Sequence, residues 1–235
     1  MLRNKINLKK LLLGLSLSFL ILPQSISHAS KKETSISLNN GVNKISHESR
    51  LLLKSRAVKY EQLEKDLDEF YDKGSSKISS DNMLYLLKKN DFTAEELDTG
   101  LEGTGLFGLG KDFKKAENTY GVNAILLMAM AKHETGNGTS ELFLEKNNLF
   151  GFNAVDLDPY NQATDFKTPG DSIDTVAKHL KEKYLSSRGD YYNGISTDAI
   201  GKSYATDPDW SKKVNWMMIE VSNNMIDQFN QEAGK

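Results

Sequence analysis

Residues 124–134 read AILLMAMAKHE, a segment that is apolar almost all round. A helix with apolar side chains on every face must be buried on every face. The segment therefore predicts a central helix around which the rest of a domain packs. Asn123 stands directly before it and is a residue type that caps helix N-termini. Glu134 ends it and is followed by TGNGTS, a loop sequence.

Glu134 has two interpretations on local physics. Most glutamates near helix ends are simply solvated. A carboxylate at a helix C-terminus, however, faces the negative end of the helix dipole, and burial beside a core helix raises its pKa. A general acid in glycoside cleavage needs such a raised pKa, because it must hold its proton near neutral pH and give it to the leaving oxygen. Local physics leaves both interpretations open.

The first 29 residues have the three parts of a secretory signal. MLRNKINLKK is basic, LLLGLSLSFLIL is apolar, and PQSISHAS supplies the small residues Ser27 and Ala29. An apolar helix of twelve residues spans only ~18 Å, short of the ~30 Å hydrocarbon core of a bilayer. We therefore expect cleavage after Ala29 and export to the outside of a bacterial cell. The alternative is an uncleaved anchor, with membrane association through residues 11–29.

Composition limits the chemistry of the exported part. Without residues 1–29 it holds 26 basic and 32 acidic residues, so there is no electrostatic case for nucleic-acid binding. The chain has no cysteine, which excludes a thiol nucleophile and a Cys-ligated zinc. HETGN lacks the second His of the H-E-x-x-H zinc motif, and G-x-S-x-G is absent. We expect neither a metal nor a cofactor.

Hydrophobic periodicity predicts a mainly helical chain in four parts. The signal is followed by a polar linker at 30–45 and a helical N-terminal extension at 46–90. Its first helix covers 47–71, with a break near Ser55, and a shorter one starts in NMLYLLKKN. A catalytic domain follows over 91–235.

Local signals predict the elements of this domain. TAEE at 93–96 fits a capping box, and GTGLFGLG is a loop that joins two helices. Gly121 ends the helix in KDFKKAENTYG. NNLFGFNAVDLDPYNQATDFKT has short β-favouring runs and predicts a small β lobe, so the fold class is α+β.

The last two predicted helices each have one apolar face. Asp171 caps the first of them, and Asp207 with Pro208 starts the second as N-cap and N1. The apolar residues are Ile173, Val176, Ala177, Leu180 and Tyr184 in one helix and Trp210, Val214, Met217, Val221 and Met225 in the other.

Four blocks in order, HETGNGTS, NNLFGFNAVDLDPY, KYLSS and YATDPDW, resemble the bacterial endo-β-N-acetylglucosaminidase family, the glucosaminidase domain of cell-wall autolysins. The resemblance covers about residues 100–230 and implies a lysozyme-like fold. It also implies hydrolysis of the β-1,4 bond on the reducing side of N-acetylglucosamine in peptidoglycan. Glu134 is implied as the acid, since it is the Glu of the family's E-[ST]-G-x-G motif. Tyr204 in YATDPDW matches a family Tyr near that acid, where it either contacts substrate or simply packs.

Further groove residues follow from the same motifs. We expect the substrate groove to be bordered by Asn147, Asn148 and Phe150 of NNLFG. The asparagine amides can hydrogen-bond sugar hydroxyl and acetamido groups there, and Phe150 can simply pack. Asp209, in the first turn of the last helix, is a further substrate-binding candidate, whereas Trp210 is predicted to be core.

Family members often have a second acid in the β lobe. The candidates in and just before this region are Glu145, Asp156, Asp158 and Asp165. A carboxylate ~5 Å from the acid supports a covalent route, and one ~6.5–9.5 Å away positions a water. With neither, the substrate's own acetamido oxygen attacks. The sequence leaves all three routes open.

Two alternative functions are a lytic transglycosylase acting on the same glycan and a non-catalytic wall-binding or scaffolding module. Three alternatives stay open for targeting to the wall: binding by the substrate groove, an anchor formed by residues 11–29, or a protein partner held by residues 46–90.

Overall fold

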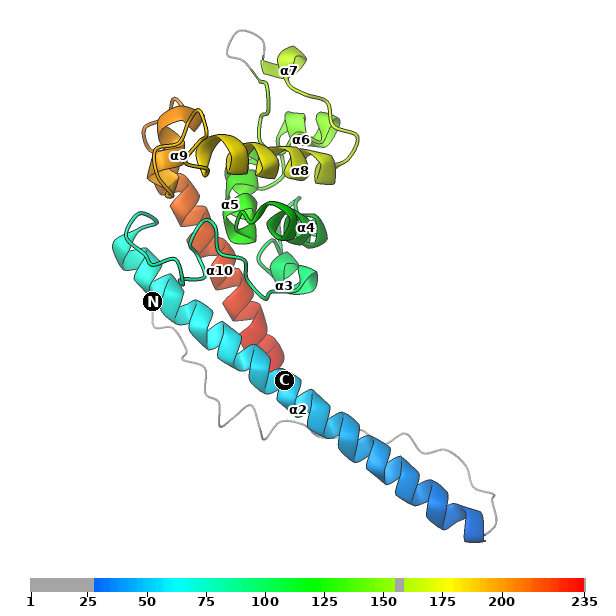
Figure 1. The fold of residues 1–235 in the computed structure, drawn as a ribbon. Helices are drawn as coiled ribbons and strands as arrows, with labels where there is room; N and C mark the ends of the chain where they lie inside the picture. Colours follow the sequence, from blue (N-terminus) through cyan, green and yellow to red (C-terminus); the bar gives the residue numbers. More distant parts are fainter. Residues whose placement is uncertain (1–27, 155–158, 235) are drawn as a thin grey trace. The chain divides into compact units, whose positions relative to one another are not determined.

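The computed structural model describes residues 28–154 and 159–234 (Figure 1). Over these ranges the chain is mainly helical and contains no β-strand. Most of the predicted signal, residues 1–27, lies outside them. None of the helices within the described ranges combines the length and the apolar character that a bilayer crossing requires. The mainly helical character predicted from hydrophobic periodicity is confirmed.

The described residues form two compact units, one that extends to Gln62 and also includes the chain from Phe229 onward, and one of Leu63–Gln228. Helices α2 (His28–Lys73) and α10 (Trp210–Gly234) each contribute to both. In the smaller unit the ring of Tyr60 stacks on that of Phe229, with centroids 4.3 Å apart. The Arg56 guanidinium lies over the same ring and 3.2 Å from the Glu232 carboxylate. These contacts fix the end of α10 against α2.

Helix α2 is longer than the sequence predicted. The segment 30–45, expected as a linker, is its first part, and the break expected near Ser55 is replaced by continuous helix. Only some of its large apolar side chains are covered by the rest of the fold. Leu63, Leu67 and Phe70 are buried, whereas Leu51, Leu52 and Val58 are more than half exposed.

The larger unit is built around α5 (Ala124–Thr135), which lies between α4, α8 and α10 in Figure 1. Side chains from Ala124 to Lys132 are at most 1% exposed, which confirms the prediction of a central helix. Lys132 is also buried, and its ammonium lies 3.3 Å from the Glu220 carboxylate of α10, which offsets part of the cost of burying the charge. The surrounding elements are α3 (Ala94–Thr99), α4 (Gly110–Tyr120), α6 (Glu141–Lys146), α7 (Pro159–Gln162), α8 (Pro169–His179), the π-helical turn η1 (Leu180–Tyr184) and α9 (Thr197–Tyr204).

Most predicted helix ends are confirmed. Thr93 and Glu96 form the capping box of α3, and the Asn123 side chain accepts hydrogen bonds from the first amides of α5. Gly121 ends α4 in the left-handed conformation, at φ 68°. The cap of α8 differs: Thr168 is the N-cap, and Asp171 is its N3 partner in a capping box rather than the cap itself.

The start of α10 also differs from the prediction. The helix begins at Trp210, three residues after the predicted cap. The predicted capping contact is nevertheless present, because the Asp207 carboxylate accepts the amide of Asp209 and the Asp207 carbonyl accepts that of Trp210. Its buried face includes Met218 in place of the predicted Met217. Helix α9, capped by Ser196, was not predicted.

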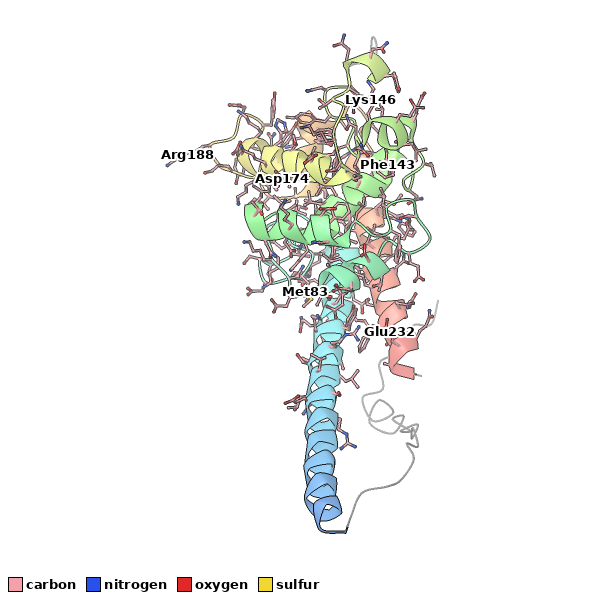
Figure 2. All side chains as sticks on the ribbon, turned by 90° about the vertical axis from the view of Figure 1, so that its right-hand side faces the viewer. Met83, Phe143, Lys146, Asp174, Arg188 and Glu232 are labelled. Carbon is pink, nitrogen blue, oxygen red and sulfur yellow. The ribbon has the colours of Figure 1, made fainter. Side chains whose placement is uncertain are left out.

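The predicted β lobe is not found in the described part of residues 147–168. Three residues there, Asn147, Gly151 and Asn153, have positive φ, which interrupts extended backbone. The side-chain amides of Asn147 and Asn148 donate to the backbone carbonyls of Phe166, Phe152 and Thr164, which a β-ladder would otherwise pair with backbone amides. Just before this segment, the Lys146 ammonium lies 4.3 Å from the centre of the Tyr160 ring and donates to the Tyr160 carbonyl. Figure 2 shows Lys146 on α6.

Residues 82–90, predicted to begin a short helix, contain no helix: turns and bends run to Leu87, and residues 88–90 are irregular. The Asn82 side chain accepts the amide of Leu84 and donates to the carbonyl of Asp66 on α2. Asn123 donates to the carbonyls of Met83 and Tyr85. These bonds compete with the helical pattern, as asparagine side chains commonly do.

Candidate active site

Glu134 lies in the last turn of α5 and is half-buried. The indole N–H of Trp210 donates a hydrogen bond to its Oε1 across 2.9 Å. Burial raises the pKa of Glu134 above its ordinary value, and this effect exceeds the opposing influences of the Trp210 hydrogen bond and of His133. The carboxyl group therefore combines a fixed orientation with an increased tendency to hold its proton.

The chain leaves α5 directly after Glu134 through a fixed turn. Gly136 takes the left-handed conformation at φ 57°, and its amide donates to carbonyls of the last helical turn. The hydroxyl of Thr135 donates to the Ala131 carbonyl and accepts the amide of Gly138. Because these bonds use backbone groups on both sides of it, Glu134 has a well-defined backbone position.

The glycine-rich loop at 103–110 packs against this turn. The Gly105 amide donates to the Asn137 carbonyl across 2.9 Å. A Cβ on Gly105 would lie 2.3 Å from the Gly138 carbonyl oxygen, so a side chain cannot be added without displacing backbone. The loop joins α3 to α4, as the sequence predicted, and it adjoins the turn that holds the candidate acid.

A row of aromatic rings begins at Trp210. The rings of Tyr204 and Trp210 have centroids 4.9 Å apart, and Tyr184 lies 5.9 Å from Tyr204 in an edge-to-face arrangement. Burial, followed by the nearby negative charge of Glu134, raises the pKa of Tyr204 well above its usual range. Tyr204 is therefore a neutral phenol in the electrostatic field of the candidate acid.

The row of rings branches at Tyr184. One branch reaches Tyr191, 5.0 Å away, whose side chain is 44% exposed. The other passes through His179 to Phe152 in the segment after α6. Burial, followed by the charge of Lys183, lowers the pKa of His179, so its imidazole is neutral at physiological pH. Trp210, Tyr204 and Tyr184 thus connect the last helix to the predicted groove region.

The asparagines of NNLFG have internal partners. Asn147 ends α6 in the left-handed conformation, and its side-chain amide donates to the Phe166 carbonyl. Asn148 is 1% exposed, donates to the carbonyls of Phe152 and Thr164, and accepts the Phe152 amide. Phe150 is buried. These contacts shape the backbone of the segment, and direct binding of substrate by the three residues stays a prediction.

The candidates for a second acid fall into two groups. Glu145 is exposed and accepts a hydrogen bond from the Tyr160 hydroxyl, and Asp165 is exposed. Asp156 and Asp158 lie outside the described residues.

Asp209, the further substrate-binding candidate, is exposed, and its carboxylate lies 2.7 Å from the Lys212 ammonium. Across the described ranges, no three His, Asp or Glu side chains come together as a metal site.

The contact between Trp210 and Glu134 was missed by sequence reasoning. Trp210 was correctly predicted to be core, at 2% exposure, but its polar N–H was not assigned a partner. A buried indole N–H normally has a hydrogen-bond acceptor, so the residue type itself was a signal. The acceptor could not be identified because it lies 76 positions away in the chain.

Residues 110–223 match the model of a protein family, glucosaminidase, described as mannosyl-glycoprotein endo-beta-N-acetylglucosaminidase. A Streptococcus pneumoniae serotype 4 protein provisionally named an endo-beta-N-acetylglucosaminidase is 32% identical over 145 residues, 60% of this chain and 22% of that protein. A bifunctional autolysin of Staphylococcus aureus is 27% identical over 157 residues, 54% of this chain and 12% of that protein.

Among solved structures, the crystal structure of Staphylococcus aureus Autolysin E is similar with a TM-score of 0.50 and 25% identity. The match covers 63% of this chain and 75% of that chain. The two sequence relatives are much longer proteins, and this chain spans less than a quarter of the length of either.

Proposed function

We propose that this chain, whose residues 110–223 belong to the glucosaminidase family, is a peptidoglycan hydrolase that cleaves the β-1,4 bond on the reducing side of N-acetylglucosamine. The family resemblance that four sequence motifs indicated is confirmed by the family match. Relatives named endo-beta-N-acetylglucosaminidase and autolysin support both the bond type and the cell wall as the substrate. The chain's own residues support the chemistry.

The observation that carries the proposal is the state of Glu134. Its carboxyl group lies at the end of a helix that is buried over almost its whole length, burial raises its pKa, and Trp210 donates a hydrogen bond to one oxygen. The other oxygen is then available to carry the proton. In our proposal Glu134 gives this proton to the glycosidic oxygen as the bond to the anomeric carbon breaks, so that the leaving sugar departs as a neutral alcohol.

Tyr204 is proposed as the second catalytic residue. Positive charge develops on the anomeric centre as the bond breaks, and the N-acetyl group of the substrate lies beside that centre. A neutral phenol next to Glu134 can donate a hydrogen bond to this acetamido group and orient it. We propose that the anomeric carbon is attacked by the acetamido oxygen, by a water or by a second carboxylate, and that on the first and third routes a water then opens the intermediate, so that every route ends in hydrolysis. Glu145, Asp156, Asp158 and Asp165 are the candidates for a second carboxylate.

We further propose that residues 1–29 direct export and that the enzyme acts in the cell wall. The basic, apolar and small-residue segments of the sequence support export, and the autolysin name of a relative supports the location. Residues 46–90 are proposed as an extension of a catalytic domain that covers 91–235. A lysozyme-like arrangement is proposed for that domain.

The decisive experiment compares Glu134→Gln with the parent on purified peptidoglycan. We expect a 10²- to 10⁴-fold loss of turnover, about the contribution of general acid catalysis, with unchanged circular dichroism. Glu141→Gln is the matched control, because Glu141 is an exposed glutamate of the neighbouring helix. Parental activity in folded Glu134→Gln protein would overturn the proposal.

Mass spectrometry of the parental digest tests the reaction type. Reducing-end N-acetylglucosamine is the expected product. Anhydro-muramic ends would identify a lytic transglycosylase, and intact strands would favour a wall-binding module. A high-mannose glycopeptide is assayed in parallel, because the description of the family names mannosyl-glycoprotein. Cleavage of the glycopeptide alone would contradict peptidoglycan as the substrate.

A further inference from the structure

A second candidate site adjoins the turn that holds Glu134. A cavity of about 320 Å³ lies between the end of α5 and the first turns of α10, lined by His133, Lys212, Lys213, Trp216 and Met217. His133 immediately precedes Glu134 in the chain. Cavities of this volume are at the small end of ligand-binding sites. The cavity is therefore suited to one ring-sized group rather than to a long ligand.

Trp216 gives this cavity an aromatic wall. Its side chain is 60% exposed, in contrast to Trp210 six positions earlier, which is 2% exposed. A large exposed aromatic side chain has an unfavourable contact with water that a ligand can remove. The indole also offers an apolar face and a polar N–H, a combination that favours partly polar ligands.

The charges around the cavity are balanced. The Lys212 ammonium lies 2.7 Å from the Asp209 carboxylate, and the Lys213 ammonium lies 2.6 Å from that of Asp207. Each ammonium has three N–H donors, so one partner leaves donors for a ligand. The paired carboxylates cancel the attraction that two lysines would exert on an anion. The wall thus combines an aromatic face with hydrogen-bond donors and little net charge.

A neutral pyranose ring matches these features better than an anion or a purely apolar group does. One face of such a ring carries C–H groups that can stack on an indole, and its hydroxyl and acetamido oxygens accept hydrogen bonds from ammonium groups. We propose that the cavity at Trp216 is an accessory subsite that binds one N-acetylhexosamine unit of the glycan strand. This inference rests on the proposed function, because it takes the glycan as the ligand.

The experiment measures binding rather than cleavage. Glu134→Gln protein is titrated with a chitin hexasaccharide and with purified glycan strands, and Kd is determined by calorimetry. In that background Trp216→Ala is expected to raise Kd about 3- to 10-fold, the range for loss of one aromatic contact. Trp216→Phe, which keeps an aromatic face, is expected to stay within about 2-fold of the parental Kd. Tyr71→Ala is the control, because Tyr71 is a similarly exposed aromatic residue on α2.

Fluorescence provides an independent measurement, since the chain has only two tryptophans. Acrylamide quenches the exposed Trp216 more than the buried Trp210, and saturating hexasaccharide is expected to protect it. Unchanged Kd in Trp216→Ala, or unchanged quenching in the saturated complex, would overturn the subsite. If only the proposed function fails, the wild type leaves peptidoglycan intact while Trp216 still binds the hexasaccharide.

Discussion

Trp210 Nε1 and Glu134 Oε1 are 2.9 Å apart, in a hydrogen bond that joins the first turn of α10 to the last turn of α5. The donor is buried, and α5 is buried over almost its whole length. The orientation of the candidate acid is therefore set by two elements of the protein core. A change in either helix is transmitted directly to the carboxyl group.

Replacing the Trp210 indole should change both the rate and its pH dependence. In Trp210→Phe the Glu134 carboxylate loses a hydrogen bond that lowers its pKa, so the pKa should rise further. Activity requires the protonated acid and is lost as pH rises through this pKa. The alkaline limb of kcat/KM against pH should therefore move to higher pH, while kcat falls about 10- to 100-fold through poorer orientation.

Trp216→Phe is the matched control for that profile, because it removes the other indole N–H of the chain without touching Glu134. Its alkaline limb should coincide with the parental one. A Trp210→Phe profile with lower rates but the parental limb would show that Trp210 acts only through packing.

Tyr204→Phe tests the proposed role of the phenol. The ring contacts with Trp210 and Tyr184 do not require the hydroxyl, so the fold should be retained. Loss of one hydrogen-bond donor from a transition state typically costs 10²- to 10³-fold in kcat, and we expect a decrease of at least about 10²-fold. Tyr120→Phe, which removes a hydroxyl bound to Asp174, should keep parental kcat. Equal kcat in Tyr204→Phe and the parent would remove Tyr204 from the mechanism.

The ionised Glu134 carboxylate should lower the free energy of unfolding at neutral pH. Its folded-state pKa is raised above the ordinary value of 4.5, so the folded protein binds the proton more tightly than the unfolded chain does. Stability falls as pH rises from about 4.5 through the raised pKa. Glu134→Gln removes this ionisation and should raise Tm at pH 7–8, with a smaller difference below about pH 4.5. Thermal melts at several pH values measure the difference, and a constant or reversed difference would contradict burial as the cause.

Gly105→Ala should destabilise the protein through a backbone clash. The new Cβ would meet the Gly138 carbonyl oxygen at 2.3 Å. Overpacking of this kind typically costs about 1–3 kcal/mol, and each 1 kcal/mol lowers Tm by roughly 2–4 °C in a chain of this size. Phe107→Ala in the same loop is the control, since Phe107 is 61% exposed and its loss should be nearly neutral. A Tm of Gly105→Ala equal to that of the control would contradict this prediction. It would show that the loop at 103–110 can move away from the turn at Gly138 at little cost in free energy.

The elements that sequence reasoning identified are those determined by local chemistry. A segment of this length that is apolar almost all round favours a core helix, and Asn123, Thr93 and Gly121 have residue types that are common at helix ends. Glu134 was singled out as the candidate acid because its motif and its place at the end of that core helix agree, and its role stays a prediction. None of these inferences required a distant part of the chain.

The features that were missed depend on distant partners. Asn148 stabilises irregular backbone through Phe152 and Thr164, so the β-favouring composition of its segment was misleading. The turns at 82–90 are stabilised by Asp66 and Asn123, which local propensity does not include. The partner of the Trp210 N–H was hidden for the same reason. Tertiary hydrogen bonds override weak local preferences in each case.

The contact between Gly105 and Gly138 links two loops that are separate in sequence. One hydrogen bond joins Gly105 to Asn137, and the two glycines leave no room between the backbones. An insertion in either loop alone would break this register and move the turn after Glu134. During evolution the two loops should therefore change length together, as one inherited unit.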